Sequence, residues 1–397
     1  MHISIRNKKV DIDRRTFLYL FDNSIYYDHK DYLLACEEES IAMRKLITLS
    51  REANINYALF FAPYDLVVDA VNKENKRIFQ GFEGKFTLSI RGKRINLNLV
   101  RMVIKDLKIK QAFIGRYLST GINPHPRFLA NSPKSLHEQA QYILDALGLD
   151  IDTMRSQRSK PAAMMYVIDQ LEKQNILVAI ESSTNMPQNM NHADGVSGVY
   201  IKDKKFPYVF IANEGQLDFE SGAGRKIFTI MYLLVCMFKG RSKVVSLEGE
   251  TKEDANTDIY EIVEEMLLPE TDLPKMNHYT LDELDDLSAH LKVTARAILL
   301  RLKHLDYVDK DNYWQLLEAL RGRFAAHKAR QKELRQEGKA RTYAPNISAN
   351  IIAYHGKAFV KILKNLHGNG RLTQRQINLH LAYGRQEVNS SEVFRKI

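Results

Sequence analysis

Residues 227–238 read IFTIMYLLVCMF and contain no charged side chain. An uninterrupted apolar run of this length predicts a buried helix. Lys239 and Gly240 follow it and provide a stop signal. The run is shorter than the roughly 20 residues that a helix needs to cross a bilayer. The sequence therefore predicts a central helix inside a globular domain and no membrane partner.

The flanking segments predict the elements around this helix. Residues 206–213, FPYVFIAN, have the composition of a short buried strand, and residues 216–223 form a polar stretch that we expect to be a loop. A second helix is expected at residues 258–268, where Pro269 ends it. Another buried strand is expected at residues 176–180, ILVAI.

This order of elements resembles the ImmA/IrrE family of zinc-dependent metallo-endopeptidase domains. The similarity covers residues 150–290, and its clearest parts are IFTIM at 227–231, MLLP at 266–269, GVSG at 195–198 and PYVFIAN at 207–213. The resemblance implies an α+β fold with a zincin-like domain. In that family an HExxH box on the central helix and an acidic residue on the next helix bind zinc.

The zinc chemistry does not carry over. Tyr232 and Cys236 occupy the positions of the two histidine ligands, and Leu233 occupies that of the general-base glutamate. Leucine accepts no proton, and tyrosine is a poor zinc ligand at neutral pH, so we expect no zinc and no catalysis. The third ligand position is Asp258, although Asp254 fits the motif if one helical turn is inserted. The alternative is an active endopeptidase with unusual zinc ligands.

Length, cysteine content and net charge indicate the number of domains, the cellular compartment and the kind of partner. The chain has 397 residues, enough for two or three domains, and two cysteines, which imply no disulfide framework. The first residues lack the apolar segment of a signal peptide, so a cytoplasmic protein is expected. A net charge of +10 favours an acidic partner, of which nucleic acid is the commonest, although such an excess also serves solubility.

Five segments are predicted along the chain. They are an N-terminal helical unit that resembles a remnant of a helix-turn-helix module (1–70), a connecting region (71–130), the peptidase-like domain (131–278), a helix-turn-helix-like unit (279–320) and a basic C-terminal helical segment (321–397). Within them, apolar spacing predicts single helices over 32–53, 97–118 and 352–366.

The helix-turn-helix-like unit and the basic run after it are the candidate nucleic-acid surface. Apolar spacing places Ile298 and Leu302 inward and the basic residues of the second helix outward, with Tyr307, Val308 and Tyr313 as a possible wing. Residues 321–341 hold eight Lys or Arg against two Glu. The alternative is a unit that only completes the fold, followed by a solvated helix. The candidate contacts are Arg296, Arg301, Lys303, Arg321, Arg323, Lys328, Arg330, Lys332 and Arg335.

The sequence thus predicts a mostly helical α+β protein with a small antiparallel sheet and a degenerate peptidase box. We expect a cytoplasmic regulator of the repressor, antitoxin, prophage or phage-defence type, which binds a protein or DNA and holds no cofactor. A DNA-binding regulator that works through residues 280–345 is the second alternative to a protein-binding one.

Overall fold

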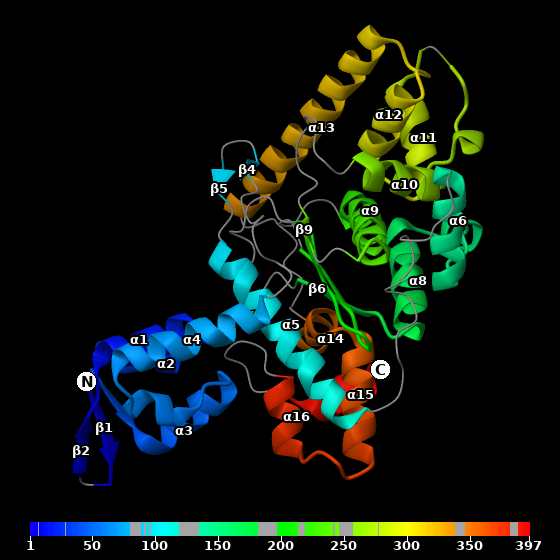
Figure 1. Cartoon of the computed structure of the whole chain (residues 1–397). Coiled ribbons are helices and arrows are strands. Elements are labelled where there is room, and N and C mark those ends of the chain that lie inside the picture. The colour runs from blue at the N-terminus through cyan, green and yellow to red at the C-terminus, as the bar shows by residue number, and fades with distance from the viewer. Residues whose placement is uncertain are drawn as a thin grey trace. The chain divides into compact units, whose positions relative to one another are not determined.

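The computed structural model describes residues 1–6, 8–27, 29–79, 89–90, 93–94, 97–118, 135–181, 197–212, 219–240, 243–245, 257–276, 278–337, 346–381 and 388–397. The chain divides into two compact units. Unit 1 comprises Met1–Thr120, Ala179–Gly195 and Ile347–Ile397, and unit 2 comprises Gly121–Val178 and Val196–Asn346. The described part is mostly helical with small sheets, an α+β composition (Figure 1).

Unit 1 begins with a small sheet covered by helices. Strands β1 (His2–Ile5) and β2 (Lys8–Asp11) form an antiparallel hairpin, and β3 (Ser40–Ala42) pairs with β1 in parallel. The helices around it are α1 (Arg14–Asp22), α2 (Lys30–Glu37), α3 (Met43–Glu52), η1 (Tyr57–Phe61) and α4 (Tyr64–Ile78). Phe17, Phe21, Tyr32 and Phe60 fill the core between them.

The single helix predicted over residues 32–53 is wrong. Helix α2 ends at Glu37, Glu39 adopts a φ of 51°, and Ser40–Ala42 extends as β3 before α3 starts. Ile41 is buried because it pairs with Ile3 of β1, and the next buried residue, Leu46, belongs to α3. The apolar residues therefore keep a helix-like spacing even though the chain is extended between the two helices. A tertiary strand pairing therefore overrides the local helical pattern.

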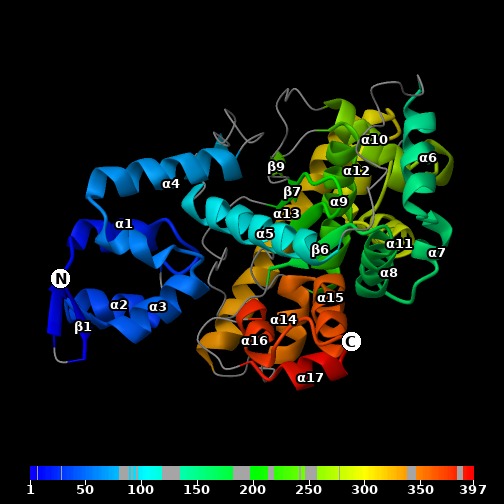
Figure 2. The ribbon, with the colours of Figure 1, turned by 60° about the horizontal axis from the view of Figure 1, so that its bottom comes forward.

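The remainder of unit 1 is a helical group around α5 (Leu97–Tyr117), which forms the long single helix that the sequence predicts. A short hairpin, β4 (Ser89–Ile90) and β5 (Lys93–Arg94), precedes it. Figure 2 shows α5 beside α14 (Ile347–His355), α15 (Lys357–Gly368) and α16 (Gln374–His380), and α17 (Ser390–Arg395) packs on these three helices. The one helix predicted over 352–366 is instead two, because Gly356 takes a φ of 87°.

Unit 2 is built around α9 (Phe219–Phe238). Its sheet has the order β6-β8-β7-β9, with β6 (Leu177–Ile180), β7 (Gly198–Ile201), β8 (Tyr208–Ile211) and β9 (Lys243–Val245). Helix α9 packs on β7 and β8 and on the helices α8 (Lys160–Lys173) and α10 (Thr257–Leu267) (Figure 1). Helices α6 (Leu136–Leu147) and α7 (Ile151–Arg155) complete this layer.

The buried helix predicted at residues 227–238 is confirmed, but α9 starts earlier than expected. Phe219 opens the helix, so residues 219–223 of the predicted polar loop are helical. Residues 213–218 lie outside the described residues. In the part of the chain that the structure describes, no helix combines the length and hydropathy that a membrane span needs.

The last part of unit 2 is a helix-turn-helix followed by a long helix. Helix α11 (Leu281–Leu291) begins with a capping box between Thr280 and Glu283, and α12 (Ala295–His304) is capped by Thr294. Lys292 closes α11 at a φ of 61°. Helix α13 (Lys310–Gln336) follows, so the predicted wing is wrong: Tyr313 lies in the first turns of α13, and Tyr307 is buried.

Candidate functional site

The positions of the degenerate peptidase box form part of the packed interior of unit 2. Tyr232, Leu233 and Cys236 are all buried on α9. Leu233 lies on the backbone of β7: a Cβ atom built on Gly198 would be 2.9 Å from the Leu233 Cδ1 atom and 2.7 Å from the carbonyl oxygen of Phe210. Close packing therefore fills the position where the family resemblance places a base and its water.

The third position of the box, Asp258, lies in the first turn of α10, and its carboxylate forms an ion pair with Lys239 at the end of α9. Of the other carboxylates on this helix, Glu261 is exposed, and Glu265 contacts His137 and Arg301. Among the described residues, no group of three His, Cys, Asp or Glu side chains can hold a metal ion. The side chains at the box positions thus do not fit a zinc site.

A buried ionic network joins α10 to α12. The side chain of Glu264 is 1 % exposed, and both of its carboxylate oxygens lie 3.0 Å from Nδ1 of His304. Arg301 directs Nη1 toward Glu264 at 3.4 Å and Nη2 toward Glu265 at 2.9 Å, while its Nε donates to the carbonyl of Leu268 at 3.1 Å. Arg301 therefore lies between two carboxylates, and Glu264 lies between a guanidinium and an imidazole.

The prediction that Arg301 points outward as a nucleic-acid contact is therefore wrong. Arg301 follows Ile298 by three residues, and positions three apart lie on the same side of a helix. Its guanidinium forms ion pairs with Glu264 and Glu265 of α10. The role of Arg301 is to dock the helix-turn-helix onto the central domain.

Other predicted basic residues lie at the surface of α12 and α13. Arg296, Lys303 and Arg330 are exposed. Arg321 forms an exposed ion pair with Glu318, and Arg323 forms a bidentate pair with Asp285 of α11 at 2.8 and 3.0 Å. The structure places three more positions in α13 but does not describe their side chains: Lys328, Lys332 and Arg335.

The second half of α13 is not packed on one side as an ordinary surface helix is. Residues 322–326 are exposed at five consecutive positions, whereas a helix with one buried face covers a position about every three or four residues. Phe324 is among the exposed residues. Residues 321–336, which include this exposed stretch and contain six Lys or Arg, are called the cationic arm.

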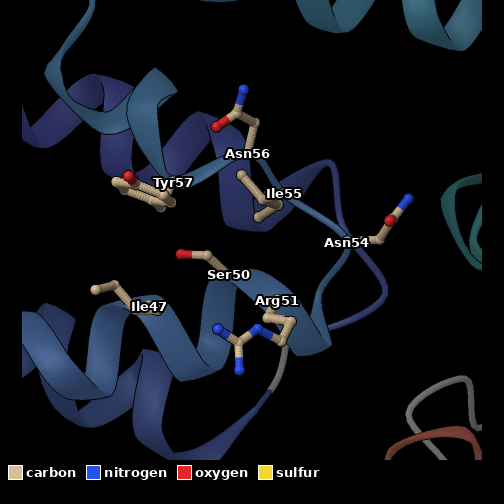
Figure 3. Close-up of a pocket in the computed structure, with 7 residues that line it drawn as sticks. All are labelled: Ile47, Ser50, Arg51, Asn54, Ile55, Asn56 and Tyr57. Carbon is tan, nitrogen blue, oxygen red and sulfur yellow. The ribbon is translucent and has the colours of Figure 1, made fainter. Parts of the chain in front are cut away.

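Unit 1 contains an open pocket between α3 and η1 that none of the predicted site residues lines (Figure 3). The ring of Tyr57 lies on one side, and Ile47 and Arg51 lie on the other, with the hydroxyl of Ser50 between them. This hydroxyl donates to the carbonyl of Leu46. The pocket is further lined by Asn54, Ile55 and Asn56.

Unit 1 contains a buried polar cluster that the sequence pattern did not predict. Lys110 on α5 lies 2.6 Å from Asp106, which also accepts a hydrogen bond from the Tyr354 hydroxyl at 2.7 Å. The Lys110 ammonium lies 4.2 Å from the centre of the Tyr354 ring, a cation–π contact. Its interruption of the apolar stripe of α5 was the signal that could have identified it.

Burial changes the acid–base properties of this cluster. Desolvation lowers the pKa of the Lys110 ammonium despite the opposing effect of Asp106. Desolvation, together with the nearby Lys110 charge, lowers the pKa of His380 to about 4. The His380 ring packs 3.8 Å from that of Phe113. The cluster thus holds α14 and α16 to α5 through buried polar and aromatic contacts.

Comparisons with known proteins do not assign this chain to a family: no family model matches it, and no curated protein or solved structure is significantly similar to it.

Proposed function

We propose that this chain is a regulatory binding protein in which a zincin-like domain of ImmA/IrrE type has lost its catalytic residues, and that it binds DNA through α12 and α13. The regulation would be of the repressor, antitoxin or phage-defence kind. The observation that carries the proposal is the run of exposed positions at residues 322–326 within a segment of α13 that is rich in Lys and Arg. The family assignment itself rests on the sequence motifs at residues 195–269.

The charge of α13 supports a polyanionic partner. Residues 321–336 contain six Lys or Arg and one Glu. Like charges in successive turns of a helix repel one another, and residues 322–326 are exposed even though Arg323 pairs with Asp285 of α11. A nucleic acid relieves that repulsion, because its phosphates neutralise the cations and release condensed counterions.

The surroundings of α13 restrict which face is available. Helix α11 exposes Asp282, Asp285 and Asp286, and Asp285 already neutralises Arg323. Phosphates are repelled from this acidic side. The remaining cations of the surface, Arg296 and Lys303 on α12 and the rest of the α13 arm, then form the contact surface.

The packing of α9 supports binding rather than catalysis. Leu233 stands at the position that the family resemblance gives to a general base, and it packs against Gly198 of β7. Asp258 is paired with Lys239. A peptidase needs both an open ligand position and a base beside it, and the described side chains offer neither.

The test is duplex DNA binding by the intact chain at several salt concentrations. The comparison variant replaces Lys328, Arg330, Lys332 and Arg335 with Ala. For each phosphate that the variant no longer neutralises, the slope of log K against log salt should fall in magnitude by roughly 0.9. Affinity at low salt should fall in parallel.

A matched control removes the same charge from unit 1. Lys8, Lys9, Lys73 and Lys76 are exposed, and their replacement by Ala lowers the net charge as much as the α13 variant does. This control should keep the affinity and slope of the unmodified protein. Equal behaviour of the α13 variant and the unmodified protein would contradict the proposal and leave a protein partner as the better explanation.

A further inference from the structure

The single tryptophan of the chain, Trp314, lies on α13 before the cationic arm. Trp314 is 44 % exposed. One exposed aromatic residue is common on protein surfaces and by itself indicates nothing. The surroundings of Trp314 and its register with the cations of α13 distinguish it.

The ring of Trp314 is held in place from one side. Tyr313, which is buried, packs against it in an edge-on arrangement with the ring centres 5.3 Å apart. The ammonium of Lys303 lies 4.6 Å from the Tyr313 ring and 5.8 Å from the Trp314 ring. Trp314 is thus an anchored aromatic surface with a cation beside it and nearly half of its area open.

The register of α13 aligns Trp314 with basic positions. Arg321, Lys328 and Arg335 follow it at intervals of seven residues, and seven residues are close to two helical turns, or about 10 Å. These four positions therefore lie along one side of the helix. Arg323, which pairs with Asp285, is nine residues from Trp314 and so lies half a turn away around the axis.

We infer that Trp314 is a stacking platform for an unpaired base, and that the Trp314–Arg335 stripe binds single-stranded nucleic acid in preference to duplex. The inference rests on the proposed function and specifies the form of its partner. An aromatic face accepts any base that is not stacked in a duplex, and cations beside it contact the phosphates that follow. In a duplex the bases are already stacked, so the ring gains no partner.

The tryptophan also reports its own occupancy, because no other tryptophan contributes to the emission. We would titrate the intact chain with an oligodeoxythymidylate of about a dozen nucleotides, with an oligouridylate of the same length, and with a duplex of that length. The two single strands share the chemistry, and their relative affinities distinguish DNA from RNA. Quenching of Trp314 emission by single strands, and not by the duplex, is expected.

Substitutions of Trp314 separate the contribution of base stacking to the affinity from the contribution of the charged residues. Trp314→Ala should weaken single-strand binding by roughly ten- to a hundredfold, as expected for the loss of one stacked base, without changing the salt slope. Trp314→Phe should keep most of the affinity. The matched control is Tyr57→Ala, which removes an aromatic residue of similar exposure from unit 1 and should change nothing.

The outcomes distinguish this inference from the proposed function. Duplex binding with a steep salt slope but without any change in Trp314 emission, or with equal quenching by duplex and single strands, overturns the stacking inference and leaves DNA binding intact. Binding to none of the three oligonucleotides overturns both. An unchanged affinity of Trp314→Ala for single strands also overturns the inference.

Discussion

Leu233 on α9 lies directly against Gly198 on β7, where an added Cβ atom would come within 2.9 Å of the Leu233 Cδ1 atom. The same hypothetical atom would lie 2.7 Å from the backbone oxygen of Phe210 and 3.2 Å from the Thr229 Cγ2 atom. Helix and sheet therefore approach as closely as a glycine allows. This contact explains why a glycine is needed opposite Leu233 on β7.

Gly198→Ala should destabilise the protein by about 1 to 3 kcal/mol, because the added methyl group forces either β7 or α9 to move. A lower midpoint in urea unfolding would show this. Gly322→Ala is the matched control: Gly322 lies in α13 with no atom within 4 Å of an added Cβ. That substitution should stabilise α13 by roughly 0.5 to 1 kcal/mol. Equal midpoints for the two variants would contradict the packing described here.

Much of the central fold could be predicted because its signals are local. The apolar run of α9 and the Thr280 capping box each depend on a few adjacent residues. Strand β3 could not be predicted, because Ser40–Ala42 extends only through pairing with β1, far away in sequence. Helical spacing within residues 32–53 contains no information about that partner.

Zinc should not copurify with the protein at a stoichiometric level. Tyr232 and Cys236 stand at the positions that the family resemblance gives to zinc ligands, Leu233 stands at that of the base, and Lys239 neutralises Asp258. Metal analysis after mild chelation is the measurement. About one equivalent of retained zinc, lost on Cys236→Ala, would contradict the assignment of a non-catalytic domain. In that case proteolytic activity would have to be tested with the reconstituted metal.

Arg301→Ala should be strongly destabilising, by about 3 to 5 kcal/mol, because Glu264 would keep a buried carboxylate after losing the guanidinium beside it. Arg296→Ala is the comparison, since Arg296 is exposed on the same helix, and it should change stability by less than about 0.5 kcal/mol. Urea unfolding of each variant gives these values. Adding Glu264→Gln to Arg301→Ala should recover part of the loss, and the absence of such coupling would argue against the network.

The sequence predicted the exposed basic residues of α12 but not the buried one, Arg301. Sequence spacing identifies which helix positions face inward, but it assigns basic residues to the surface by default. Arg301 occupies an inward position next to Leu302, and only the contacts to Glu264 and Glu265 on another helix show that its charge is satisfied there. Arg296 and Lys303 are exposed, so sequence spacing alone was enough to place them at the surface.

Unfolding stability of unit 1 should decrease on acidification because of His380. Burial and the Lys110 charge lower the pKa of His380 to about 4, below its ordinary value of 6.5. A base with a depressed pKa in the folded state binds fewer protons there than in the unfolded chain, so its contribution is intact above about pH 6.5 and is lost as the pH falls toward 4. The difference corresponds to at most about 3 kcal/mol.

The measurement is the urea midpoint at several pH values between about 7 and 4.5, followed by circular dichroism. His380→Gln removes the titrating group and should flatten the pH dependence over that interval, whatever its effect on stability at neutral pH. His290→Gln, at an exposed histidine of α11 in unit 2, should leave the dependence unchanged. If His380→Gln and the unmodified protein lose stability equally on acidification, the α5–α16 contact does not bury the imidazole, and the depressed pKa is wrong.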